Sequence, residues 1–593
     1  MLRLLTAAAL ATLALAASSS NSSCSFPSLY HANLEDLTTG LEDGCFTSVD
    51  LVDAYLARID EVNDKLHAVY EKNPDALDIA KTLDDERADG KIRGPLHGIP
   101  ILVKDNIATH DKMNNTAGSY ALLGAKVPRD SPTVAKLRAA GAVILGKTAL
   151  SEWAQYRSNV NGTNGWSAVA GQVYGPYYEH EDPYGSSSGS GVASGLGLAF
   201  AALGTETHGS IVMPSNRGNS VGIKPSVGLT SRYLVVPISL HQDTVGPIAH
   251  TVRDAATVLS VIAGVDEHDN YTQAIPNDGV LPDYIGATKG STNLTGVRIG
   301  VPRNGISPRI TFAPVNESYV LSEFDKAIDV LRDLGAEIVD PANFSTATTS
   351  EFIWELSSTK MSTENVVIGS DFISDLAAYF AELTENPNDL HSVEDLVEFT
   401  RSEPREDWPD RDIGGWLGAL ELGFNSSDVR AFEAREKLLA LDRDGGVTGI
   451  INKLNLSAVI LPTDYAPTWA ASPGLPEVTV PMGAYPPGTP IIKSARELIA
   501  VAPGIPFGLT FLGKKWSEET LIRLAYAYEQ ATHHRDKIEP GERGVSPTTG
   551  LADVVGSAPS GSETPAPDGA IGLRPAMPLL GLVGGMVLMF SAL

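Results

Sequence analysis

Serine and lysine side chains suited to proton transfer, with glycines beside the serines, are concentrated in three places along the sequence. Residues 185–191 read Gly-Ser-Ser-Ser-Gly-Ser-Gly, residues 204–210 read Gly-Thr-Glu-Thr-His-Gly-Ser, and Lys104 ends a short apolar run upstream. One helix and a short strand fit between the two serine-bearing turns, so the turns can meet. A catalytic serine needs a base within hydrogen-bond reach, and burial can lower the pKa of a lysine enough for that role. We interpret Lys104, Ser187 and Ser210 as one proton-relay site.

Three other interpretations of the first serine stretch fit less well. A flexible Gly/Ser linker is not usually followed at once by an apolar helix. A nucleophile elbow centred on Ser187 needs a strand directly before it, and residues 178–183 are polar instead. A phosphate-binding loop needs a closing Gly-Lys-Ser/Thr, which this stretch lacks. The proton-relay interpretation is therefore preferred.

A histidine-based triad stays open as competing chemistry, with His208, His241 or His250 as the base. Residues two apart in a turn rarely point their side chains at each other, so we interpret His208 as a residue that lines the pocket. The 12 histidines show no metal-ligand spacing. We predict neither a metal nor a cofactor.

Apolar periodicity predicts the elements that must position these residues. Strands are expected over 98–103, 142–145, 297–301, 336–339, 458–461, 478–480 and 498–501, and helices over 46–59, 75–89, 131–140, 251–265, 316–335 and 517–534, with a further helix beginning at Leu150. This alternation indicates an α/β fold with one large domain over residues 25–540. An acidic, aromatic-rich and helical insertion over residues 345–430 is expected to line the substrate mouth.

Long, ordered motifs along the chain resemble the amidase signature family. Beside the two serine stretches, they are Gly94–Asn106, Val221–Pro225, Gly228–Arg232, Gln242–Pro247, Gly474–Pro476, Val480–Gly483 and Gly504–Gly508. The resemblance covers most of residues 45–535. It implies a mixed central β-sheet covered by helices on both sides, and a hydrolase that cleaves a carboxamide C–N bond without a cofactor.

The resemblance also implies a role for each residue of the site. Ser210 is the nucleophile that forms an acyl-serine intermediate. Ser187, preceded by a cis peptide bond, relays the proton to Lys104. The expected oxyanion donors are the backbone N–H groups of Thr207, His208, Gly209 and Ser210.

The chain departs from the family at four positions. Many members carry Asp or Gly where His208 stands. Ser186 and Ser190 stand where glycine is frequent, and Val212 stands where members that bind acidic substrates carry arginine. A non-catalytic surface or binding protein on the same scaffold and a serine esterase with a histidine base stay open as alternatives. A subunit of a tRNA-dependent amidotransferase is disfavoured, because a net charge of −28 repels nucleic acid.

The N-terminus predicts export. Arg3 and the apolar run 4–17 read as a signal peptide over residues 1–17. Cys24 and Cys45, the two cysteines, are expected to pair in an oxidising compartment. Nine Asn-X-Ser/Thr sequences are candidate glycosylation sites: Asn21, Asn114, Asn161, Asn270, Asn293, Asn316, Asn343, Asn425 and Asn455.

The C-terminus predicts a lipid anchor. Residues 541–575 have the Ser/Pro/Gly-rich composition of a disordered stalk, and residues 576–593 form an apolar tail. Small residues at Ser560, Gly561 and Ser562 complete the pattern of a glycosylphosphatidylinositol attachment signal. We expect a glycoprotein of the secretory pathway, extracellular or on the cell surface, that is tethered to the membrane and acts on a small-molecule or peptide amide.

Overall fold

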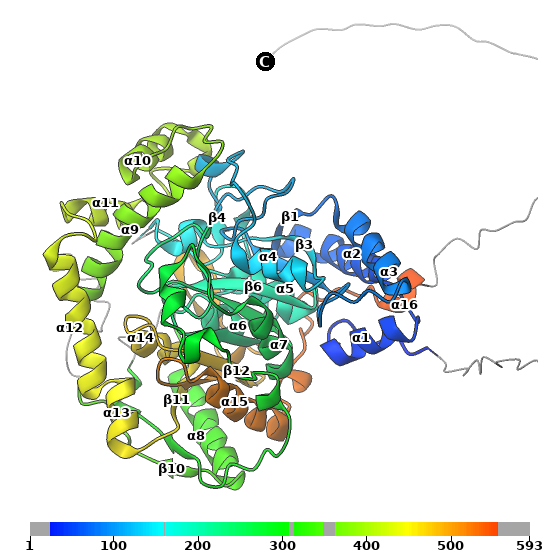
Figure 1. Ribbon diagram of the computed structural model, residues 1–593. Helices are drawn as coiled ribbons and strands as arrows, with labels where there is room; N and C mark the ends of the chain where they lie inside the picture. The colour runs from blue at the N-terminus through cyan, green and yellow to red at the C-terminus, as the bar shows by residue number, and fades with distance from the viewer. Residues whose placement is uncertain (1–23, 159–160, 308–313, 348–361, 556–593) are drawn as a thin grey trace, which may run out of the picture.

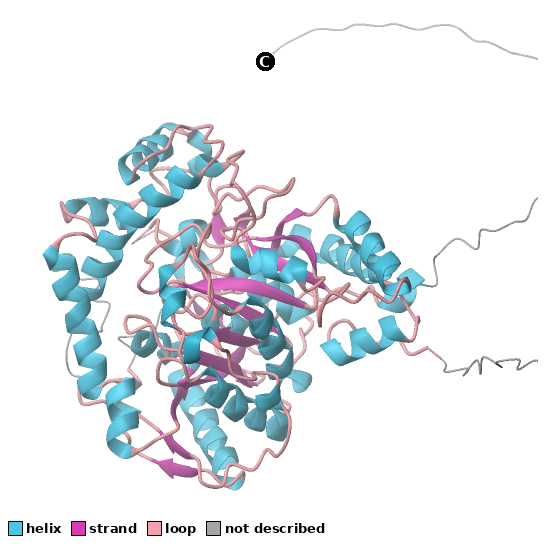
Figure 2. Cartoon of the chain, in the orientation of Figure 1, coloured by secondary structure: helices cyan, strands magenta, loops and turns pink. Residues whose placement is uncertain are grey.

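An 11-stranded mixed β-sheet runs through the centre of the molecule (Figure 2). The computed structural model describes residues 24–158, 161–307, 314–347 and 362–555. The strand order is β1-β3-β2-β6-β8-β7-β12-β15-β11-β9-β10. The strands are β1 Val69–Lys72, β2 Pro100–Lys104, β3 Val143–Thr148, β6 Ala201–Glu206, β7 Val221–Lys224, β8 Thr244–Ala249, β9 Arg298–Gly300, β10 Glu337–Val339, β11 Ala458–Pro462, β12 Glu477–Ala484 and β15 Pro506–Leu512. The predicted α/β class and mixed sheet are confirmed.

Two short strand pairs lie outside this sheet. β4 Trp166–Ser167 pairs with β5 Gly171–Gln172, and β13 Ile492–Lys493 pairs with β14 Ile499–Val501. The strand expected over residues 498–501 is therefore present, but it belongs to a separate hairpin.

Helices surround the sheet (Figure 1). They are α1 Leu34–Glu42, α2 Ser48–Leu66, α3 Ala76–Ala88, α4 Pro132–Ala139, α5 Ser188–Leu196, α6 Val212–Arg217, α7 Val252–Ile262, α8 Glu317–Asp333, α9 Thr363–Glu382, α10 Val393–Ser402, α11 Gly414–Glu421, α12 Val429–Gly445, α13 Val447–Leu454, α14 Pro467–Ala470, α15 Glu518–Thr532 and α16 Leu551–Val555. Local signals set several ends. For example, Thr47 and Asp50 form a capping box at the start of α2.

The prediction of a helix that begins at Leu150 is wrong. Only a 3₁₀ turn forms, over Glu152–Gln155, and Trp153 and Ala154 both have a φ of 50°, which ends regular helix geometry. The Trp153 side chain is 2% exposed and lies edge-on to Trp416, with ring centroids 5.9 Å apart. Tertiary packing of this indole has overridden the local helical pattern.

The insertion forms a helical layer along one side of the molecule, labelled α9 to α12 in Figure 1. Its apolar side chains, including Phe372, Leu376 and Trp416, share a buried cluster with Leu122 and Trp153 of the main domain. The expected helical character is present in the described residues 362–430. Because this cluster joins the insertion to the domain, α9 holds a defined position beside the sheet.

The two described ends of the chain lie on the same side of the molecule (Figure 1). A disulfide joins Cys24 and Cys45, as expected, with Cα atoms 5.4 Å apart. Residues 541–555, expected to begin a disordered stalk, pack on the domain instead. The backbone N–H groups of Thr548 and Thr549 donate to Glu61 at 2.8 and 3.0 Å, and Leu551 is 1% exposed. The predicted signal peptide, Ser560, Gly561, Ser562 and the apolar tail lie outside the described residues.

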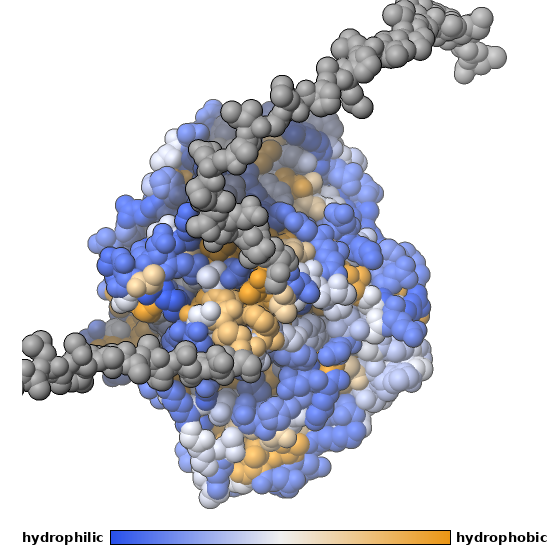
Figure 3. All heavy atoms as spheres, turned by 90° about the vertical axis from the view of Figure 1, so that its right-hand side faces the viewer, coloured by the Kyte–Doolittle hydropathy of each residue, from blue (hydrophilic) through white to orange (hydrophobic). Residues whose placement is uncertain are grey.

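Figure 3 shows this same face, where apolar side chains gather near the centre. A cavity of about 410 Å³ lies here, lined by residues 26–31, Arg58, 539–540 and 546–552. None of its lining residues belongs to the predicted proton-relay site. Among the described residues, no helix is both long enough and apolar enough to span a membrane.

Eight of the nine candidate glycosylation sites fall within the described residues, and none of those eight is buried. Asn114 and Asn316 are half-buried. The exposed ones are Asn161, Asn270, Asn293, Asn343, Asn425 and Asn455.

Candidate active site

Lys104 is fully buried at the carboxyl end of β2. The neighbouring strand β6 runs parallel to β2, with Val103 opposite Leu203, so the carboxyl ends of both strands meet at one edge. The Lys104 Nζ lies 2.8 Å from Ser186 Oγ and 2.8 Å from Thr205 Oγ1, and it donates to the Thr205 carbonyl at 3.2 Å. These partners are two hydroxyls and one carbonyl.

Burial holds the pKa of Lys104 well below the ordinary value for lysine. Desolvation disfavours the charged form. The carboxylates of Asp243 and Glu206 act in the opposite direction, but their effect is smaller. A neutral amine with hydroxyl neighbours is the state that a lysine base requires.

Ser186, and not Ser187, is the serine beside Lys104. The cis peptide bond joins Gly185 to Ser186, one residue earlier than expected. The Ser187 hydroxyl lies on the Thr205 backbone instead, donating to its carbonyl at 3.1 Å and accepting from its N–H at 3.2 Å. The expected cis bond before Ser187 and the expected contact of Ser187 with Lys104 are therefore wrong by one residue. Ser187 joins the first serine turn to β6.

Ser210 lies in the turn after β6, where this turn approaches the first serine stretch. The Ser187 N–H donates to the Ser210 carbonyl at 3.2 Å, which brings the two turns into contact as expected. Ser210 is 7% exposed. Within the described part of the chain its hydroxyl has no hydrogen-bond partner, so it is available to a substrate.

The carboxylate of Glu206 shapes the nucleophile turn, which we define as residues 207–210. It accepts from the N–H groups of Gly209 at 2.8 Å, Ile211 at 2.7 Å and Val212 at 3.0 Å. The expected oxyanion donor at Gly209 is therefore already engaged, which corrects that assignment. The backbone donors that remain candidates are Thr207, His208 and Ser210.

Gly209 has a structural role in the same turn. Its φ is +81°, and an added Cβ would lie 3.0 Å from Met213 Cγ. Left-handed backbone favours glycine. Any larger residue here would distort the turn that presents Ser210.

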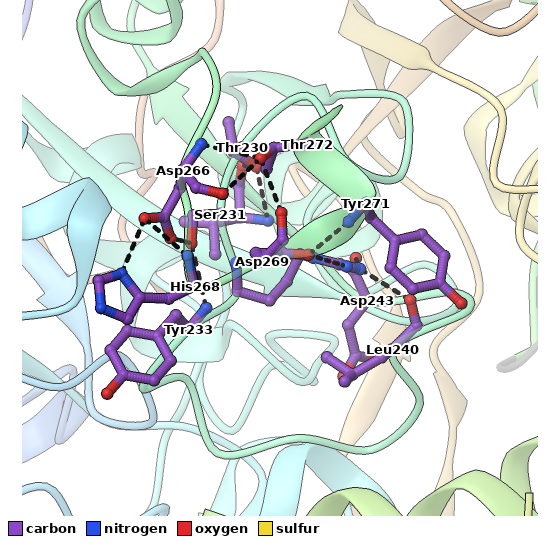
Figure 4. A network of polar contacts seen from close by, with 12 residues as sticks. Thr230, Ser231, Tyr233, Leu240, Asp243, Asp266, His268, Asp269, Tyr271 and Thr272 are labelled. Carbon is purple, nitrogen blue, oxygen red and sulfur yellow. Dashed lines mark hydrogen bonds and ion pairs between the residues drawn. The ribbon is translucent and has the colours of Figure 1, made fainter. Parts of the chain in front are cut away.

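Asp243 also contacts the nucleophile turn. The Thr207 hydroxyl donates to Asp243 Oδ1 at 2.5 Å, and burial raises the pKa of this carboxyl to about 6. Arg232 holds the Asp243 backbone by donating to its carbonyl at 3.0 Å, and it is paired with Asp269 at 2.5 Å. Asp243 and Asp269 are labelled in Figure 4. The loop that carries Asp243 is thus fixed by a buried ion pair.

The three histidines of the competing triad contact other groups. His208 Nδ1 lies 3.2 Å from Glu364 Oε1, His241 Nδ1 lies 2.7 Å from Asp371 Oδ2, and His250 Nδ1 lies 3.0 Å from the Ala32 carbonyl. Burial lowers the pKa of His250 well below its ordinary value. The carboxylate and carbonyl partners of these three imidazoles are evidence against a histidine base.

Sequence reasoning missed Thr205 and Ser186 as partners of Lys104. Thr205 would follow from the strand pairing, because it lies on β6 beside β2. Ser186 carries no distinguishing signal, since three identical serines are adjacent. In the regions that the structure describes, no group of three or more His, Cys, Asp and Glu side chains could hold a metal ion.

Comparison with known proteins identifies the family of this chain. A family model described as Amidase matches residues 50–522. A protein of Arthroderma benhamiae named "Putative amidase" is 47% identical over 537 residues, which cover 87% of this chain and 88% of the relative. The chain belongs to the amidase signature family.

Solved structures of the family superpose closely. Native peptide amidase from Stenotrophomonas maltophilia is 35% identical, with a TM-score of 0.73 over 87% of this chain and 98% of that chain. A complex of the peptide amidase PAM with the competitive inhibitor chymostatin has a TM-score of 0.75 at 36% identity, over 86% of this chain and 98% of that chain.

Proposed function

We propose that this protein hydrolyses carboxamides through an acyl-serine intermediate on Ser210, with Ser186 and Lys104 as the proton relay. The observation that carries the proposal is the contact of 2.8 Å between the buried Lys104 Nζ and Ser186 Oγ. A buried amine that is neutral at working pH can accept a proton from a hydroxyl.

In the first half of the reaction, Ser210 Oγ attacks the carbonyl carbon of the amide. The Ser210 proton passes to Ser186 Oγ while the Ser186 proton passes to Lys104 Nζ. Ser210 thus loses one proton, Ser186 gives one and receives one, and Lys104 gains one. Backbone N–H groups of the nucleophile turn stabilise the tetrahedral oxyanion. The C–N bond then breaks, and Lys104 returns its proton through Ser186 to the leaving amine.

In the second half, water attacks the acyl-serine carbonyl. Its proton follows the same path to Lys104, and the ester bond to Ser210 Oγ breaks. Ser210 recovers a proton from the relay, and the carboxylic acid product leaves. No net charge accumulates on the protein during a full cycle.

The substrate we propose is a linear carboxamide, with a C-terminal peptide amide as the first compound to test. Support comes from the likeness to the peptide amidase of Stenotrophomonas maltophilia. Val212 provides no positive charge beside Ser210 to bind a substrate carboxylate. A panel of peptide amides, short-chain amides, aryl amides and fatty amides ranks the classes by kcat/KM.

A fluorophosphonate labelling experiment tests the proposal. We expect the native protein to be labelled on Ser210, and we expect S210A to be neither labelled nor active. An unlabelled native protein would instead support a non-catalytic binding protein on the amidase scaffold. Hydrolysis of esters alone, lost in H208A and retained in K104M, would support a serine esterase with a histidine base.

We also propose that the protein is secreted, glycosylated and tethered by a lipid anchor. The sequence patterns at both ends, the Cys24–Cys45 disulfide and the exposed acceptor asparagines support this. Release from membranes by a phosphatidylinositol-specific phospholipase tests the anchor. Protein free in the medium before treatment would contradict it.

A further inference from the structure

We propose that His208 is a positioning residue, through which helix α9 of the insertion holds the nucleophile turn in its productive conformation. This inference rests on the proposed function. It concerns a side chain that the proton relay does not use, two residues from the nucleophile.

The His208 imidazole lies between two elements that are distant in sequence. Its Nδ1 is 3.2 Å from Oε1 of Glu364, which lies in the first turn of α9, and its Nε2 is 3.4 Å from Oγ1 of Thr468 on α14. The His208 side chain is 6% exposed and the Glu364 side chain 2%. The nucleophile turn is thereby bound to the insertion through a buried contact.

Glu364 is suited to hold this imidazole. Burial alone would raise the pKa of Glu364, but the charge and hydrogen bond of His208, with a hydrogen bond from Gln242, bring its pKa below the ordinary value. The Gln242 amide lies 3.2 Å from Glu364 Oε1. An ionised acceptor forms stronger hydrogen bonds than a neutral one, so the carboxylate anchors the imidazole firmly.

Two consecutive side chains fix the turn in two directions. Thr207 donates to Asp243 in the main domain, whereas His208 reaches the insertion. The backbone N–H groups of these same two residues are candidates for the oxyanion site. Because oxyanion donors act only when correctly aimed, loss of the His208 contact should misplace donors that the side chain itself never touches.

A second histidine–carboxylate contact provides a matched control. His241 Nδ1 lies 2.7 Å from Asp371 Oδ2, also on α9, but His241 belongs to a different loop. H241A removes a similar contact between the same helix and the main domain, and it leaves in place the side-chain contacts of His208 with Glu364 and of Thr207 with Asp243. Any effect due to looser docking of α9 in general will appear in this variant as well.

The experiment compares H208A, E364A, the double variant and H208N in hydrolysis of a peptide amide. We expect H208A and E364A each to lower kcat by about 10- to 100-fold, with KM changed by less than about threefold. The double variant should be no slower than the slower single variant, because the two residues act as one unit. H208N places an amide nitrogen near the position of Nδ1, so it should recover most of kcat.

The controls separate this inference from the proposed function. H241A should keep kcat within about threefold of the native value, and fluorophosphonate should label H208A more slowly than the native protein. Native-like kcat in H208A, or an H208N variant as slow as H208A, would overturn the positioning role while the labelling of Ser210 still stood. A native protein that is neither labelled nor active would overturn both.

Discussion

Two fully buried lysines lie at the ends of adjacent parallel strands and differ in their partners. Lys104 ends β2, and Lys147 lies opposite Val103 on β3. Lys104 faces the hydroxyls of Ser186 and Thr205. Lys147 donates to the Ile107 carbonyl at 2.6 Å and to the Asn115 side-chain oxygen at 2.7 Å.

Burial lowers the pKa of both lysines, but to different extents. Desolvation lowers the pKa of Lys147 to about 8, although the nearby Asp105 carboxylate acts in the opposite direction. The pKa of Lys104 falls well below its ordinary value. The partners decide what each amine can do: a carbonyl oxygen only accepts, whereas a hydroxyl can both give and accept a proton. Burial therefore favours the neutral form of both lysines, but only Lys104 has hydroxyl neighbours that can exchange protons with it.

The largest difference between the two lysines should appear in catalysis. K104M removes the base, and we expect kcat/KM for a peptide amide to fall by about 10³-fold or more. K147M removes an amine with no partner able to exchange protons, so kcat/KM per folded protein should fall by less than about tenfold. Equal losses in both variants, with both folded by circular dichroism, would contradict the comparison.

The adjacent serines test the same distinction at the partner of Lys104. S186A removes the hydroxyl that faces Lys104, and we expect kcat to fall by about 10²-fold or more. S187A removes contacts with the Thr205 backbone only, and we expect a fall of less than about tenfold with a loss of stability of about 1 kcal/mol. Steady-state kinetics and thermal unfolding of the two variants provide the measurements. A larger fall in kcat in S187A than in S186A would show that Ser187, and not Ser186, is the relay serine.

The pH dependence of kcat/KM should report Lys104 and not Lys147. Lys104 is a base only when neutral, so activity should fall as the pH drops through its lowered pKa, and this acid limb should lie well below the ordinary pKa of lysine. K147M should leave this acid limb unchanged. An acid limb near the ordinary pKa of lysine, or one displaced in K147M, would show that the wrong amine had been assigned.

The smallest expected effect concerns stability. The pKa of Lys147 is about 8 in the folded protein and near its ordinary value in the unfolded chain. Between these values the unfolded chain binds more protons, so this group raises the free energy of unfolding as pH increases from about 8 to about 10.5. The difference between the native protein and K147M should grow by on the order of 1–3 kcal/mol over this range. Urea unfolding of both proteins at several pH values measures it.

Much of the fold could be predicted from the sequence, because periodicity reports which residues are buried. The strand ending at Lys104, the helices α2, α7, α8 and α15 and the helical insertion all follow from this local pattern. The prediction of a helix from Leu150 was wrong, because Trp153 packs on Trp416, which lies more than 260 residues later in the chain. The local sequence carries no sign of that contact. The composition of residues 541–555 predicted disorder. The segment is ordered because it packs on the domain and bonds to Glu61 of α2, which is distant in sequence.

The sequence by itself determined the chemistry available to this protein: a lysine at the end of an apolar strand, two serine turns and a glycine before Ser210. Only the tertiary structure decided how these groups are used. Three neighbouring serines are chemically identical, and the path of the backbone selects Ser186 for Lys104, 82 residues away. The same holds for Gly209, whose N–H is taken by Glu206, and for His208, whose partner Glu364 lies 156 residues further along. Residue types are local properties, whereas burial, strand register and contacts between distant segments exist only once the chain has folded.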